Sequence, residues 1–510
     1  MAQGFEVLNQ HFKTIQGMRA LEPGVCSVAV RLAEWVDLGY RAAGTLKGMV
    51  NLFSPETRAG LRTQEFLELR MAEGFCAMDE EDLDRAIALL DFVLRAEEEM
   101  GHRGLAAIAH FWKGRAHRKK GEYDAAMRHV RRGREIMQTV SQHRLAAVIQ
   151  IQESWLLFQE GKAEEARRIL DEAHSHLADT DDDLSLGNIE SARGRMEQQA
   201  GRYAEALAHF DNAVELYGRR DPDHRNLARA LVNAVTVKRL IALQLRKRID
   251  ARAEQGGAGG SAADMARHTQ MCEEALKQLD RAGEVYVKQQ YHGGIAAVLV
   301  SSGYLHLDGG NIELGAIEGQ KAYELAKERN DHIHMARARV LQAMVENTRV
   351  DEQLGEDADV AVCAGRAREF AEEAIRWAEL TENRRLIAEA YVARGMVFGN
   401  DFFLDWEGAK RCADKASMLL AADDRDHLWE DLMALKSRIL RSSTIDETLR
   451  AWSEGVMGDK TFQQVTEEFA EIVIPKVWQR EGKKVSRVAS KLAISPKKVR
   501  RVLRNVGLVK

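Results

Sequence analysis

The chain has 510 residues, of which 45% are hydrophobic and 30% are charged, and only five are prolines. This length allows three or four domains or one extended repeat array, and the scarcity of proline favours long helices over a turn-rich β protein. The sequence has neither the apolar run of about 18 residues that a membrane-spanning helix requires nor the start of a secretory signal. We therefore expect an all-α protein that resides in the cytoplasm and binds no membrane.

The cysteines are scattered and form no C-x-x-C pair, which fits small buried side chains in a reducing compartment. They are Cys26, Cys76, Cys272, Cys363 and Cys412.

The net charge of −5 conceals a strong asymmetry. Residues 475–510 contain twelve Lys and Arg against one acid, Glu481, whereas the rest of the chain contains 62 basic and 78 acidic side chains. This division predicts an acidic body and a C-terminal region that binds nucleic acid.

Residues 1–80 show no repeat boundary, and we assign them to an N-terminal helical region that caps a repeat array at 81–440. Within the array, three segments align without gaps on glycines spaced 40 residues apart. Each segment has a small residue seven positions before its glycine, an alanine five after it and a larger apolar residue nine after it. The aligned residues are Gly114, Ser154 and Gly194; Gly121, Gly161 and Gly201; Ala126, Ala166 and Ala206; and Val130, Leu170 and Phe210.

This spacing predicts a helix that ends near each glycine and a second helix that crosses the first at the small residues. The pattern resembles the tetratricopeptide repeat (TPR), most closely in "GEYDAA" from Gly121 and "GRYAEA" from Gly201. Weaker matches occur at 303–322 and at 395–416, the second with two residues inserted in its turn. We expect nine to eleven helix pairs between residues 25 and 440. The resemblance implies an α-solenoid whose concave groove binds a protein, a peptide or a small ligand.

The glycine-rich segment 254–264 interrupts long amphipathic patterns and is interpreted as a flexible loop, because no phosphate-binding motif is present. Catalytic and zinc-site motifs are absent, so we expect a protein that is not an enzyme and needs no cofactor. The H-x-H pairs at 174–176 and 332–334 point to different helix faces, and the acidic run at 179–183 lacks the pattern of a calcium loop. We therefore predict no metal site.

Four arginines are the candidates for binding in the groove, because they lie on first helices of the repeats, which usually line the concave face. They are Arg115, Arg118, Arg193 and Arg195. Guanidinium groups in such places bind carboxylates of a partner, although charges on helices are more often simply solvated.

The end of the chain predicts three helices. Residues 461–482 show helical spacing of apolar residues, with Pro475 as a kink or a helix start. Ser486 is expected to cap a second helix that buries Val488, Ala489 and Leu492. In the turn "ISP", Ser495 is expected to cap a basic third helix with Pro496 at its first position, and Leu508 to pack back on that helix. Two short helices joined by a tight turn make a helix-turn-helix.

The region 461–508 resembles the Fis-type helix-turn-helix, named for the factor for inversion stimulation, which also ends the nitrogen-regulatory class of bacterial activators. The matching residues are Ser486, Ala489, Leu492, Ile494, Ser495, Val499, Leu503, Gly507 and Leu508. Three positions depart from the pattern: Ala493 replaces the turn glycine, Val488 replaces a small residue, and Pro496 replaces the arginine that begins the recognition helix.

The resemblance implies that 441–510 forms a domain that binds double-stranded DNA. Base reading is expected from Ser495, Lys498, Arg500 and Arg501, and phosphate contacts from Arg504, Lys497 and Lys498; Ser486 completes the set of expected DNA-binding residues. Fis-type domains dimerise through preceding helices, which here correspond to 444–480.

The sequence as a whole favours a bacterial transcription regulator with a TPR sensor and a DNA-binding head. The alternative is a TPR adaptor or scaffold subunit of a multiprotein system, recruited to a protein partner through its groove.

Overall fold

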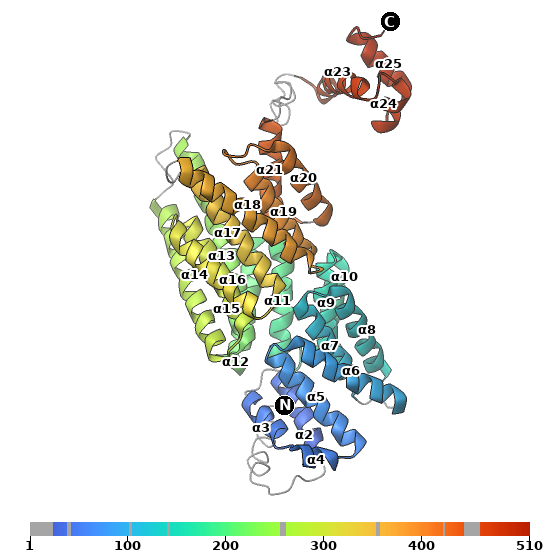
Figure 1. Ribbon diagram of the computed structural model, residues 1–510, viewed down its shortest axis with the longest axis vertical. Coiled ribbons are helices and arrows are strands. Elements are labelled where there is room, and N and C mark those ends of the chain that lie inside the picture. The colour runs from blue at the N-terminus through green and yellow to red at the C-terminus, as the bar shows by residue number, and fades with distance from the viewer. Residues whose placement is uncertain are drawn as a thin grey trace. The chain divides into compact units, whose positions relative to one another are not determined.

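The computed structural model describes residues 24–37, 42–100, 105–139, 143–254, 262–352, 357–421, 424–442 and 460–509. All regular secondary structure in these ranges is helical, which confirms the all-α prediction (Figure 1). The chain divides into two compact units, residues 1–433 and 434–510. Most of the predicted loop at 254–264, the segment 444–458 and the start of the chain lie outside the described residues.

The first described helices of the first unit are α2 (Val25–Asp37), α3 (Ala43–Asn51) and the short α4 (Pro55–Ala59), and α2 packs on α5. Eight consecutive helix pairs follow, and then α21 (His427–Ser442). The pairs are α5 (Thr63–Asp79) with α6 (Leu83–Met100), α7 (Ala106–Lys120) with α8 (Tyr123–Thr139), α9 (His143–Gln159) with α10 (Ala163–Leu177), α11 (Asp183–Gln199) with α12 (Tyr203–Arg220), α13 (Arg225–Glu254) with α14 (Ala262–Lys288), α15 (His292–Asp308) with α16 (Ile312–Glu328), α17 (His332–Asp351) with α18 (Asp357–Glu379), and α19 (Arg384–Phe398) with α20 (Trp406–Leu419).

The described pairs are fewer than the nine to eleven expected from the sequence. The difference arises because some helices are longer than a TPR helix: α13 has 30 residues, α14 has 27 and α18 has 23. The inserted turn at 395–416 is confirmed. In the aligned repeats the left-handed residue follows the small residue by seven positions, whereas here Leu404, with a left-handed φ of 49°, follows Gly395 by nine.

The repeat pattern of the sequence has the expected physical cause. Gly121, Gly161 and Gly201 end their helices with φ between 76° and 84°, a left-handed conformation that costs glycine little. A Cβ atom on Gly114 would lie 2.8 Å from Val130, so the crossing of α7 and α8 requires a residue without a side chain. At the equivalent place in the next repeat, the Ser154 hydroxyl donates to the carbonyl oxygen of Ala166 at 2.9 Å.

The turns of early repeats dock onto turns late in the array, so the superhelix closes on itself. The carbonyl oxygen of Gly121 accepts from the amide of Glu382 at 2.8 Å, and that of Gln159 accepts from Nε of Arg384 at 2.7 Å. The carbonyl oxygen of Gln199 accepts from the amide of Arg425 at 2.9 Å. We call these contacts the closure. Figure 1 shows the cyan turns after α9 and α11 beside the orange α19.

The second unit contains α23 (Phe462–Arg480), α24 (Val485–Lys491) and α25 (Pro496–Asn505). The three helices bury their own apolar core, which consists of Ala470, Ile474, Val488, Ala489, Val499, Val502 and Leu503. Pro475 lies inside α23, so it does not begin a helix.

Candidate functional site

A cavity of about 1580 Å³ fills the inside of the array. It is lined by the first helix of each pair from α7 to α19 and by the start of α21, as expected for the concave face of a TPR array. The second helices of the pairs form the outer layer. The volume exceeds the roughly 300–1,000 Å³ of a typical small-molecule pocket, so the space suits a ligand of several residues.

Four arginines from four different helices face this cavity and form what we call the arginine cluster. They are Arg118 of α7, Arg195 of α11, Arg229 of α13 and Arg337 of α17. None of them forms an ion pair with a carboxylate among the described residues. The buried Nε atoms of Arg118 and Arg229 lack any hydrogen-bond partner, although Nη2 of Arg229 donates to Asn188 at 3.3 Å.

The arginine cluster is electrostatically strained in the free protein. Burial, together with the charges of Arg229, Arg115 and Arg195, lowers the pKa of the Arg118 guanidinium to about 9. Burial and the charge of Arg229 likewise lower the pKa of Arg195 to about 10, and Arg337 adds to the effect. Arg118 gains one compensating contact, because its guanidinium lies 4.8 Å above the ring of Trp155.

The four predicted groove arginines have different environments. Arg118 and Arg195 line the cavity as expected. Arg115 also lines it, but its guanidinium is paired with Asp37. Arg193 differs from the expectation: it is not part of the lining, and its guanidinium pairs with Glu190 and Asp171, each at 2.9 Å. Residues two apart on a helix point to different faces, which separates Arg193 from Arg195.

Acidic side chains line another wall of the cavity. Glu389 of α19 and Asp431 of α21 have no hydrogen bond or ion pair with any described residue. Burial raises the pKa of Glu389 above its ordinary value and that of Asp431 to about 6. The charge of Arg239 acts on both carboxylates, but Nη2 of Arg239 donates to Asp308 at 3.1 Å.

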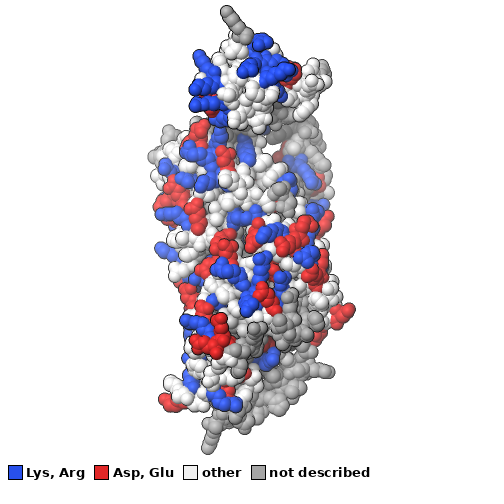
Figure 2. Space-filling view, turned by 90° about the vertical axis from the view of Figure 1, so that its right-hand side faces the viewer, with Lys and Arg blue, Asp and Glu red and all other residues white. Residues whose placement is uncertain are grey.

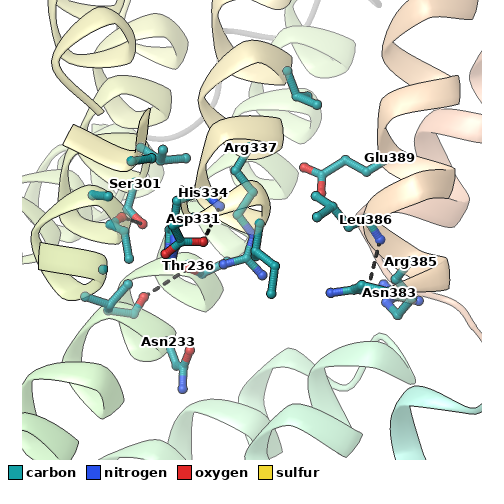
Figure 3. A pocket seen from close by; sticks show the side chains of 18 of the residues that line it. Asn233, Thr236, Ser301, Asp331, His334, Arg337, Asn383, Arg385, Leu386 and Glu389 are labelled. Atoms are coloured by element: carbon teal, nitrogen blue, oxygen red, sulfur yellow. Dashed lines mark hydrogen bonds and ion pairs between the residues drawn. The ribbon is translucent and has the colours of Figure 1, made fainter. Parts of the chain in front are cut away.

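Figure 3 shows Arg337 and Glu389 extending from α17 and α19 into the space between these helices. Asn233, Thr236 and Ser301 line the same part of the cavity. Beside Arg337, Nδ1 of His334 lies 2.7 Å from a carboxylate oxygen of Asp331.

The sequence pattern did not identify Arg229, Arg337, Glu389 or Asp431. Arg229 and Arg337 lie on the first helices of α13–α14 and α17–α18, where the repeat alignment is weak. Their positions on the concave face follow from helix register, which only a correct helix boundary would have revealed.

No group of His, Cys, Asp and Glu that would hold a metal ion occurs among the residues with described positions. In the acidic run, Asp182 caps α11 by accepting from the amide of Ser185 at 3.1 Å. No helix in the described ranges is long and apolar enough to cross a membrane.

The second unit places a basic helix against a small core. The Ser495 hydroxyl accepts from the amide of Lys498 at 3.2 Å, and Pro496 occupies the first position of α25, as predicted. Ala493 adopts the left-handed φ of 51° that glycine would adopt in the turn. The turn thus forms with alanine, at an energetic cost of about 1 kcal/mol.

The side chains of Lys497, Arg500, Arg501 and Arg504 are exposed on α25, whereas Lys498 is half-buried. Nη2 of Arg501 lies 3.4 Å from Glu467 of α23. On the face drawn in Figure 2, Lys and Arg predominate on the second unit, whereas the array mixes both charges. The exposed face of α25 is therefore predominantly positive, with Glu467 of α23 beside Arg501.

Two expectations for this unit were wrong. Lys484, not Ser486, precedes the first residue of α24, so Ser486 lies in the first turn and caps nothing. Leu508 is 40% exposed, and Val509 packs on the core in its place. The left-handed Gly507, with φ of 71°, turns the chain so that the later residue faces inward.

A family model described as tetratricopeptide repeat matches residues 185–242, which span α11, α12 and the first part of α13. A search of curated proteins found no match.

Among solved structures, a Rap protein complexed with competence and sporulation factor is 11% identical, with a TM-score of 0.50 over 82% of this chain and 99% of that chain. The apo form of the quorum sensor NprR from B. thuringiensis is 12% identical, with a TM-score of 0.41 over 81% and 92%. The Rap conjugation gene regulator of the plasmid pLS20, in complex with the Phr* peptide, is 13% identical, with a TM-score of 0.45 over 71% and 99%. The first likeness concerns the fold alone. Together with the family match, it shows that the chain is a TPR-like α-solenoid with a tetratricopeptide repeat at 185–242.

Proposed function

We propose that this protein is a bacterial, cytoplasmic transcription regulator. Its repeat array binds a peptide or small-molecule signal in the cavity, and its C-terminal unit binds double-stranded DNA. The observation that carries the DNA-binding role is the basic face of α25, held by a core that α23 and α24 complete. A second helix presented in this way after a tight turn suits the major groove of DNA.

The side chains on α25 have the chemistry that DNA recognition needs. Arg500 and Arg501 are long, exposed donors that suit the acceptor atoms of guanine, and Lys497 and Arg504 suit phosphates. The pairing of Arg501 with Glu467 is exposed and weak, so a phosphate or base displaces it at little cost.

The sensing role is supported by the cavity and its unpaired charges. The solved Rap structures named above contain competence and sporulation factor in one case and the Phr* peptide in the other. By analogy, we propose that a peptide binds to the concave face of the present array.

The DNA-binding role is tested by titrating fluorescent duplexes from the upstream region of the protein's own gene with the full-length chain. The double variant Arg500→Ala, Arg501→Ala should bind at least tenfold more weakly, because each lost contact to a base is worth ~1–3 kcal/mol. The control Lys476→Ala, Arg480→Ala removes the same charge from α23 and should change affinity less than threefold. Absence of binding by the unmodified chain at low salt, or equal losses in both variants, would contradict the proposal.

A further inference from the structure

The arginine cluster differs from other arginines of the array in having no carboxylate partners among the described residues. Several other arginines of the first helices have carboxylate partners: Arg225 lies 2.7 Å from Asp79, and Nη1 of Arg349 lies 2.6 Å from Glu346. The arginine cluster has none, although Arg118, Arg195, Arg229 and Arg337 converge from four helices on one cavity. Arg118, Arg195 and Arg229 are half-buried and Arg337 is exposed, so these charges are partly desolvated and still accessible to an anion from outside.

The carboxylates of Glu389 and Asp431, on another wall of the same cavity, also form no hydrogen bond or ion pair among the described residues. The charges of Arg337, Arg385 and Arg239 nevertheless act on Glu389, and those of Arg239 and Lys247 act on Asp431. Glu389 extends into the space that Arg337 enters from the neighbouring helix, yet the two side chains form no ion pair (Figure 3). The cavity thus has one wall that requires a negative charge and another that accepts a positive charge.

We propose that the cavity binds a short peptide as a dipolar ligand, with a carboxylate on the arginine cluster and a basic group at Glu389 and Asp431. This inference rests on the proposed sensing function and narrows its ligand to one chemical class. The arginines supply forked donors that match a carboxylate, and two carboxylates suit an ammonium or guanidinium group.

Charge distribution separates this ligand from the alternatives. A polyanion such as a nucleotide would satisfy the arginine cluster but would be repelled by Glu389 and Asp431. An uncharged ligand would leave both sets of charges without an ion pair. The cavity volume of about 1580 Å³ accommodates several residues rather than a single amino acid.

The test uses synthetic hexapeptide pools and the full-length protein. Peptides in the dipolar pool have free termini and contain one Glu and one Lys at varied positions. In the blocked pool Gln and Met replace these two residues, and both termini are capped. Peptides retained with the protein after rapid filtration are counted by mass spectrometry, and inorganic phosphate and ATP are added as competitors.

The dipolar pool should be retained at least tenfold over the blocked pool, and millimolar phosphate or ATP should not displace it. The double variant Arg118→Gln, Arg195→Gln should retain the dipolar pool at least tenfold less. Glu389→Gln should also retain it less, because every peptide of this pool contains Lys. Arg193→Gln, on the other face of α11, should retain the pool as the unmodified chain does. Circular dichroism melting checks that each variant is folded.

Equal retention of both pools, displacement by phosphate or ATP, or full retention by the arginine double variant would overturn the inference. DNA binding of each preparation is measured separately. Peptide retention without DNA binding would leave the inference standing and remove the proposed DNA-binding role, and DNA binding without retention would do the reverse.

Discussion

Arg384 donates from Nε to the carbonyl oxygen of Gln159 at 2.7 Å, although 225 residues separate them along the chain. Its Nη1 atom also donates to the carbonyl oxygen of Leu419 at 2.8 Å. One side chain therefore links the end of α9, the start of α19 and the end of α20. These hydrogen bonds help to fix the superhelix in the closed form that surrounds the cavity.

Replacing this link should destabilise the array. Arg384→Ala leaves two backbone carbonyls without their partner, at a cost of ~1–3 kcal/mol in the free energy of unfolding. Urea denaturation followed by circular dichroism measures this cost. The control Arg376→Ala removes an arginine whose side chain is 69% exposed and should change stability by less than ~0.5 kcal/mol. Equal stability of the two variants would show that the closure contributes nothing.

Two glycines distinguish the contribution of the closure to stability from the cost of a left-handed backbone. Gly201 and Gly310 have nearly the same φ, 76° and 78°, but a Cβ on Gly201 would lie 2.7 Å from the carbonyl oxygen of Arg425, whereas one on Gly310 would meet nothing. Gly310→Ala should therefore cost only the ~1–2 kcal/mol of a left-handed alanine. Gly201→Ala should cost ~1–3 kcal/mol more, because the turn must move away from Arg425. Urea midpoints of the two variants give the comparison, and identical midpoints would refute the close approach.

The arginine cluster should lower the stability of the free protein, so that removing one of its charges raises the free energy of unfolding. Arg195→Gln removes a desolvated charge among like charges and should stabilise the folded protein, raising the free energy of unfolding by ~0.5–2 kcal/mol. Arg193→Gln, two residues away, loses its partners Glu190 and Asp171 and should be destabilising by ~0.5–1 kcal/mol. Denaturation of both variants tests the opposite signs. A loss of stability in Arg195→Gln would mean that this arginine is structural.

Asp431 should give stability a characteristic dependence on pH. Its pKa is raised to about 6 by burial, against the opposing charges of Arg239 and Lys247 and with those of Glu430 and Glu389. Since the folded pKa lies above the unfolded one, the contribution to stability is fully present below about pH 4 and is lost as the pH rises through 6. Asp431→Asn should thus match the unmodified chain at pH 4 and exceed its stability by ~2–3 kcal/mol at pH 7.5. A difference that does not vary with pH would contradict this pKa.

DNA binding should depend steeply on salt. Each phosphate contact contributes about 0.9 to the slope of log affinity against log salt concentration. Arg504→Ala should reduce the slope by about 1 and weaken all sequences alike, whereas Arg500→Ala should weaken the preferred sequence most. Anisotropy titrations between 50 and 300 mM salt on two duplexes distinguish these effects. A salt slope unchanged by Arg504→Ala would place this residue away from the phosphates.

The local features of the fold were predictable because each follows from residues close in sequence. The left-handed turns at Gly121, Gly161 and Gly201 and the cap at Ser495 are set within a few residues, and the structure has all of them. The cap assigned to Ser486 failed because α24 begins two residues earlier than that cap requires, at Val485, an error within the ordinary uncertainty of a helix boundary.

The closure and the cavity could not be predicted from patterns of residues close in sequence. Contacts such as Arg384 to Gln159 depend on the summed curvature of the six helix pairs from α9–α10 to α19–α20, which no single repeat encodes. Arg195 was placed correctly because its repeat aligned well, but Arg337 was missed because its repeat did not. Glu389 and Asp431 look like ordinary surface carboxylates in the sequence, and only the folded array shows that they face the arginine cluster across one space.

Recovery of bound genomic fragments is the decisive test of the proposal that α25 binds DNA. Fragmented genomic DNA is incubated with the full-length protein at moderate salt, and the retained fragments are sequenced. If α25 binds DNA as proposed, a small set of sites should be enriched, which the Lys476→Ala, Arg480→Ala control retains and the Arg500→Ala, Arg501→Ala variant loses. Absence of enriched sites, or the same sites from both variants, would contradict it.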